Sequence, residues 1–143
     1  MKNDTINFFV EEIDFEATNS IDLKQWLNQI IVAHKGKLSF INYIFCDDEY
    51  LHKINVEYLN HDTYTDIITF DYEEEVIESD IFISIDRVKE NAKELKVSFE
   101  EELHRVMAHG ALHLLGFGDK TPEEKLKMRE LEEECLSKLA TIL

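Results

Sequence analysis

One segment near the C-terminus constrains this chain most, because it predicts a helix that begins at Ser98 and ends before Gly116. Ser98 followed by Glu101 is the capping-box pattern that opens helices. Gly116 stands where such a helix would end, since glycine readily adopts the left-handed cap conformation. His109 and His113 lie four residues apart within this helix, about 40° from each other around its axis. The helix is therefore expected to present two imidazoles on one face near its C-terminal end.

The residues after this helix complete the spacing of a metal site. Asp119 comes three residues after Gly116, so the chain can return a carboxylate to the ion that the histidines hold. A histidine pair alone is common on amphipathic helices, but His-x3-His-x2-Gly-x2-ligand is the spacing of the long metzincin signature. Two imidazoles and one carboxylate suit a catalytic zinc ion, and also suit iron or another divalent ion. His104 lies about 140° around the helix from His109 and is not expected to join the group.

Gly110 sets this pattern apart from metalloproteases, which carry a glutamate at that position. A hydrolase needs a group that moves protons within hydrogen-bond reach of the reacting atoms, and glycine supplies none. Gly110 can instead let another element approach the helix closely. Asp66, which follows Thr65 directly before an expected strand, is our candidate for the general base. The alternative is that Thr65 and Asp66 only bond nearby backbone in a turn, and the sequence leaves both open.

Hydrophobic periodicity predicts an α+β fold, in which residues 1–143 form a single mixed α/β domain. We expect about four strands in a mixed sheet packed with about five helices, and a metal site at the C-terminal end of a central helix. The expected strands are residues 6–10, 40–46, 67–72 and 81–85, the last two joined by the acidic stretch 73–79. The expected helices cover Leu23 to Ile31, Leu51 to Tyr58, Val88 to Leu95, the histidine segment and a closing segment that begins at Thr121.

Composition limits the classes of function that remain. With 44% hydrophobic residues, one proline and four glycines, the chain is not expected to be disordered. No signal peptide or membrane span fits residues 1–12, and Cys46 and Cys135 match no redox or metal spacing, so a cytoplasmic location is expected. The net charge of −16 disfavours direct binding of nucleic acid. Acidic runs such as 100–102 and 132–134 are expected on solvated faces.

A resemblance to a known family extends over about residues 40 to 135, a range that includes the histidine helix. The segment from His109 to Phe117 resembles the signature of the YbeY family of bacterial rRNA maturation factors, described as zinc-dependent single-strand endoribonucleases. The other matching positions are Asn55, Tyr58, Asp62, the block 65–70 and the strand 80–84.

The resemblance implies a mixed α/β fold and a zinc ion held by His109, His113 and Asp119. It also implies single-strand endoribonuclease activity in maturation of the 3′ end of 16S rRNA. The implied partners are ribosomal RNA and pre-30S particles, with small-subunit ribosomal proteins and a ribosome-assembly GTPase as further expected partners and no membrane. Two alternatives stay open. One is a non-catalytic ribosome assembly factor with a structural metal site, and the other is a metallopeptidase-like hydrolase, against which Gly110 counts.

Four positions depart from the family pattern. Asp119 replaces a histidine, which keeps a metal ligand but lowers the net charge of the site. Leu59 stands where the family usually has an arginine that faces the RNA, and leucine offers neither a phosphate contact nor charge stabilisation. Lys120 and Arg105 are our candidates to supply a cation for substrate binding instead. The remaining departures are Tyr64 for proline and Ser79 for glycine.

Overall fold

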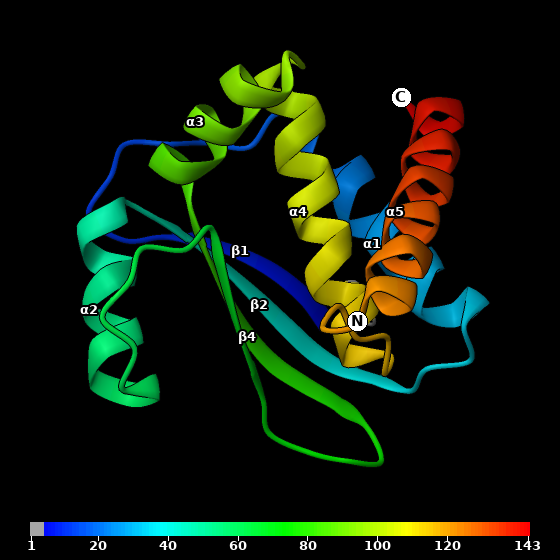
Figure 1. Ribbon diagram of the computed structural model, residues 1–143. Helices are drawn as coiled ribbons and strands as arrows, with labels where there is room; N and C mark the ends of the chain where they lie inside the picture. Colours follow the sequence, from blue (N-terminus) through cyan, green and yellow to red (C-terminus); the bar gives the residue numbers. More distant parts are fainter. Residues whose placement is uncertain (1–4) are drawn as a thin grey trace.

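The computed structural model describes residues 5–143 as a four-stranded mixed sheet with helices on both faces (Figure 1). The elements are β1 (Ile6–Val10), α1 (Ser20–Ala33), β2 (Leu38–Cys46), α2 (Asp48–Leu59), β3 (Ile67–Asp71), β4 (Ile77–Ser84), α3 (Ile85–Leu95), α4 (Phe99–Leu114) and α5 (Pro122–Ile142). The strand order is β1-β2-β4-β3, in which β1, β2 and β4 run parallel and β3 runs antiparallel to β4. The expected α+β class is confirmed.

The larger core lies between the sheet and helices α1, α4 and α5. Every second side chain of β2 is buried in it, as the two-residue period of a strand requires: Ile41, Tyr43 and Phe45. Two buried polar atoms find backbone partners across this core. The Tyr43 hydroxyl donates to the Met107 carbonyl of α4 at 2.9 Å, and the Trp26 indole of α1 donates to the Cys135 carbonyl of α5 at 2.8 Å. The first bond ties α4 to the sheet, and the second ties α5 to α1.

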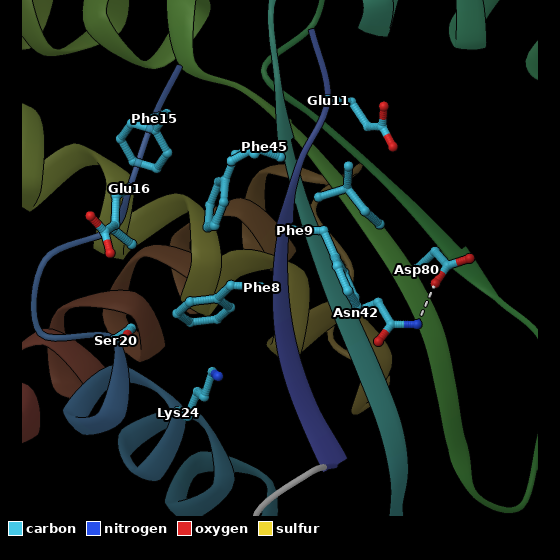
Figure 2. A pocket seen from close by; sticks show the side chains of 13 residues that line it. Phe8, Phe9, Glu11, Phe15, Glu16, Ser20, Lys24, Asn42, Phe45 and Asp80 are labelled. Carbon is cyan, nitrogen blue, oxygen red and sulfur yellow. Dashed lines mark hydrogen bonds between the residues drawn. The ribbon is translucent and has the colours of Figure 1, made fainter. Parts of the chain in front are cut away.

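The β1 edge of the sheet separates two surfaces of different chemistry (Figure 2). On the side of α4, the Phe8 ring packs edge-to-face against Phe45, with 5.6 Å between centroids. On the opposite side, the Asn42 amide donates to the Asp80 carboxylate at 3.0 Å, next to the exposed Phe9. A hollow of about 750 Å³ extends along this edge. Its lining includes no histidine, so it is chemically distinct from the expected metal site.

Helix α2 covers the opposite face of the sheet with a small core of Cys46, Leu51, Ile54 and Ile68. Asn55 of α2 is buried and holds the chain that follows the helix. The side-chain amide of Asn55 donates to the Thr63 carbonyl at 2.9 Å, and the backbone carbonyl of Asn55 accepts from the His61 N–H at 3.1 Å. These bonds give the segment between α2 and β3 a defined path along the sheet.

Strand β4 corrects one predicted boundary. It begins at Ile77, so the connection after β3 is shorter than the predicted stretch 73–79. Glu78 pairs with Phe40 of β2, and Ser79 is fully buried. The polar residues at 78–80 concealed a strand whose alternate side chains are nevertheless buried.

Side-chain caps set the starts of the later helices. The Ser84 hydroxyl accepts from the Arg87 N–H at 3.2 Å, so α3 begins at Ile85, which the sequence had placed at the end of a strand. The Ser98 hydroxyl accepts from the Glu101 N–H at 3.1 Å, as the capping pattern predicted for α4. Within residues 5–143, no helix has both the length and the apolar character needed to cross a membrane.

Candidate metal centre

The C-terminal end of α4 brings together the three predicted metal ligands. Gly116 has a φ of 101°, and its N–H donates to the His113 carbonyl at 3.0 Å, so the chain turns back after the helix. Asp119 Oδ2 then lies 3.3 Å from His109 Nε2 and 3.4 Å from His113 Nε2. One ligand atom from each residue lies within 4.8 Å of the others. Among residues 5–143, this is the one group of histidine, cysteine or acidic side chains close enough to hold an ion together.

Hydrogen bonds at the opposite ring nitrogens orient both imidazoles. His113 Nδ1 lies 2.9 Å from the Phe117 carbonyl, which can only accept, so Nδ1 carries the proton. His109 Nδ1 lies 2.6 Å from Glu132 Oε2, and a carboxylate likewise favours the proton on Nδ1. Both rings therefore direct the Nε2 lone pair toward Asp119. This donor set fits zinc or a similar divalent ion, since three protein ligands leave a position for water or substrate.

His104 does not belong to this group, as the helix spacing predicted. Its ring lies edge-on to Trp26 in the core, with 6.1 Å between centroids. Burial lowers the pKa of His104, opposed by Glu100, so the neutral form is favoured. The histidine is a core residue.

The ligands line one side of a cleft of about 550 Å³, and Asp66 lies in the same cleft. The Asp66 carboxylate accepts from its own backbone N–H, as a turn residue would, but it also reaches beyond its turn, because Oδ2 accepts from the Asn91 amide of α3 at 3.2 Å. Burial raises the pKa of the Asp66 carboxyl, partly opposed by His109, by the hydrogen bond from its own backbone N–H and by Arg105. A carboxylate with a raised pKa is a stronger base. The structure thus places the candidate base beside the ligands, which the sequence could not do.

Leu59, which replaces the family arginine, and the two candidate cations lie in different environments. Leu59 lines the cleft and is 40% exposed. Lys120 is exposed but is not among the residues that line the cleft. The Arg105 guanidinium donates to Glu102 and to Glu132, in both cases at 2.9 Å. This placement argues against Arg105 as a phosphate contact, whereas contact through Lys120 stays a prediction.

Two glutamates that the sequence placed on solvated faces are buried, namely Glu102 and Glu132. Glu132 lies one helical turn after Met128, within the apolar stripe of α5, and this position was the signal that sequence reasoning missed. Burial would raise the pKa of Glu132, but hydrogen bonds from His109 and Arg105 outweigh it, so the pKa is lowered. Glu132 is therefore a buried, charged neighbour of His109, a candidate metal ligand.

Gly110 explains why a protease-type glutamate is absent from α4. A Cβ at this position would lie 3.0 Å from Ile67 Cδ1 and 3.1 Å from Ile81 Cδ1. The helix therefore approaches β3 and β4 closely here, as the glycine suggested. A side chain at position 110 would point into the sheet and not toward the ligands.

Replacing Gly110 with glutamate is expected to lower the free energy of unfolding by about 3 kcal/mol or more. Overpacking alone costs about 1–3 kcal/mol, and a buried carboxylate without a partner costs more. Urea unfolding of Gly110→Glu and Gly110→Ala measures the effect, and the alanine variant should lose less. Unchanged stability of Gly110→Glu, together with a gain of peptidase activity, would contradict this account.

Comparisons with known proteins match this chain over most of its length. A family model described as Endoribonuclease YbeY matches residues 7–140. Endoribonuclease YbeY of Flavobacterium johnsoniae is 54% identical over 130 residues, covering 90% of this chain and 94% of that protein. The Cytophaga hutchinsonii protein of the same name is 50% identical over 139 residues, covering 96% and 97%. The solution structure of TM1509 from Thermotoga maritima superposes with a TM-score of 0.66 at 29% identity, covering 95% of this chain and 92% of that one. Matched over nearly all of its length in sequence and in fold, the chain belongs to the endoribonuclease YbeY family.

Proposed function

We propose that this protein is a zinc-dependent endoribonuclease that cleaves single-stranded RNA, in the cytoplasm, during maturation of the 3′ end of 16S rRNA. The observation that carries the proposal is the convergence of His109, His113 and Asp119 on a cleft that also contains Asp66. The names of the curated relatives support the nuclease class. Pre-30S particles are the proposed setting, with small-subunit ribosomal proteins and a ribosome-assembly GTPase as partners.

The residues of the cleft divide the chemical work. His109 and His113 would hold an ion through Nε2, and Asp119 would add a negatively charged ligand. When bound, a zinc ion supplies Lewis acidity, which favours ionisation of water and neutralises charge on a phosphate oxygen. Asp66 accepts the proton of the attacking hydroxyl, and its raised pKa strengthens it as a base.

The proposal is tested with an RNA oligonucleotide that carries the 3′ end of 16S rRNA, using chelated protein before and after addition of zinc. We expect cleavage only with zinc. A 5′-phosphate on the downstream product would indicate attack by water, whereas a 2′,3′-cyclic phosphate would indicate attack by the ribose hydroxyl. Zinc binding without cleavage would overturn the nuclease proposal.

A non-catalytic ribosome assembly factor is the second candidate, and two observations favour it. Leu59 presents an apolar side chain at the cleft where the resemblance implies an arginine. The net charge of −16 also suits basic ribosomal proteins better than RNA. In this case the ion would be structural. Binding of pre-30S particles would then not depend on a coordination position of the ion that is open to water or substrate.

The nuclease proposal predicts the effect of placing a cation at position 59. We expect Leu59→Arg to raise kcat/KM on single-stranded RNA about 10- to 100-fold. The reason is that a hydrogen bond from a charged donor stabilises by about 1.5–3 kcal/mol. The logarithm of affinity should also fall more steeply with the logarithm of salt concentration, by about 0.7 for each additional phosphate that the arginine neutralises.

Val56→Arg is the matched control for this variant. Val56 lies on the same helix and is 42% exposed, close to the 40% of Leu59, but it is not among the residues that line the cleft. It adds the same charge outside the cleft and should change kcat/KM much less. Equal gains from both variants would show a general effect of charge and contradict the role given to position 59.

A further inference from the structure

A series of charged side chains, of which the two glutamates are buried and the others partly buried, leads to the metal centre. Arg105 of α4 donates to Glu102 through Nε at 2.9 Å and to Glu132 of α5 through Nη1 at 2.9 Å. The second oxygen of Glu132 accepts a hydrogen bond from His109 Nδ1 at 2.6 Å. The exposed fractions of the two carboxylate side chains are 1% and 2%. Each side chain in the series thus holds the next, and the last of them is a metal ligand.

Charge balance shows that this series does more than join α4 to α5, which lie side by side in Figure 1. Two buried carboxylates, Glu102 and Glu132, share the single guanidinium of Arg105. The group therefore has one negative charge in excess, and an uncompensated buried charge is strongly destabilising. The Glu132 oxygen that Arg105 does not contact accepts from His109. Nε2 of the same ring faces Asp119, where a bound ion would add positive charge. A metal ion at this centre would therefore compensate the excess negative charge of the group.

The two imidazoles are held by different acceptors. His113 donates to a neutral backbone carbonyl, that of Phe117, whereas His109 donates to the carboxylate of Glu132. A charged acceptor makes the shorter and stronger hydrogen bond and leaves the imidazole a better electron donor at its other nitrogen. His109 is therefore the better fixed and the more strongly donating of the two rings.

We propose that Glu132 is a positioning residue of the metal centre, and that Arg105 holds its carboxylate in place. Glu132 sets the tautomer and orientation of His109 and so increases the affinity of the site for zinc. The inference rests on the metal site of the proposed function, but it does not depend on RNA cleavage. It also gives Arg105 a role in the interior that replaces the expected contact with substrate.

The test is a competition titration that measures zinc affinity in the full chain. We expect Glu132→Gln to weaken zinc binding about 10- to 100-fold, the range that loss of such an outer contact produces. Glu133→Gln is the matched control, because Glu133 is the next residue of α5, is exposed and loses the same charge. Its zinc affinity should equal that of the wild type. Circular dichroism establishes that each variant is folded before titration.

A second variant and a second readout keep the test decisive. If Glu132→Gln does not fold, Arg105→Lys decides, since lysine keeps the charge but cannot hold two carboxylates in the guanidinium geometry; we expect about tenfold weaker zinc binding. In proton NMR, the Nδ1 proton of His109 should move upfield in Glu132→Gln, which a purely structural role of Glu132 would not require.

The outcomes separate this inference from the proposed function. Wild-type affinity in folded Glu132→Gln, or equal loss in Glu132→Gln and Glu133→Gln, would overturn the role of Glu132 alone. Failure of the wild-type protein to bind zinc would overturn the metal site, and both proposals with it. Zinc affinity that depends on Glu132, without RNA cleavage, would uphold this inference and leave the nuclease proposal overturned.

Discussion

Replacing His113 with alanine is expected to abolish stoichiometric zinc binding and to lower RNA cleavage by about 1,000-fold or more. A metal ion contributes several kcal/mol of charge stabilisation in the transition state, and each 1.36 kcal/mol corresponds to about a factor of ten in rate. With His113 removed, only His109 and Asp119 of the ligand group remain. Zinc content and cleavage of one RNA substrate, both measured on the same preparations, check the prediction.

His104→Gln is the matched control, because His104 lies on the same helix but packs against Trp26 in the core. It should keep zinc and cleavage, with at most a modest loss of stability. Loss of zinc with full cleavage in His113→Ala would show that the ion is structural. Equal loss of activity in both variants would indicate damage to α4 and not removal of a ligand.

The parts of the fold that were predictable from the sequence are those with local causes. Helix α4 and its end follow from the Ser98 cap and from Gly116, which both act within a few residues. The grouping of His109, His113 and Asp119 was predictable in the same way, because the three residues lie within eleven residues of chain. Strand β4 was placed too late because polar side chains at its start masked the alternation of buried residues.

What could not be predicted depends on contacts between distant segments. Glu132 is separated from His109 by 23 residues, and only the docking of α5 on α4 brings the two together. Asp66 reaches the cleft because β3 pairs antiparallel with β4 at the sheet edge, beneath α4. Arg105 illustrates the same limit through Glu132, which lies 27 residues away on another helix. Periodicity within one helix cannot show which of its charged residues will be paired in the interior.

Replacing Asp66 with asparagine is expected to lower cleavage by about 100- to 10,000-fold, the usual contribution of a general base. Asparagine has nearly the same shape, and its side-chain oxygen can still accept the hydrogen bond from Asn91. Zinc affinity should stay close to that of the wild type, because Asp66 is not one of the three ligands. A variant that loses zinc as well as activity would contradict the assignment of Asp66 as a base.

The same variant should not lose stability at neutral pH, and this follows from the sign of the pKa shift. Burial raises the pKa of Asp66 in the folded state, so folding favours the protonated carboxyl. The wild type therefore loses stability as the pH rises from the unfolded pKa through the folded pKa, a loss that a neutral asparagine avoids. Urea unfolding of the zinc-free proteins should show Asp66→Asn at least as stable as the wild type near pH 7, with that advantage vanishing in acid. If the charged Asp66 carboxylate is kept for catalysis at a cost in stability, removing its charge should not destabilise the protein. Lower stability of Asp66→Asn at neutral pH would instead mean that the charged carboxylate stabilises the fold.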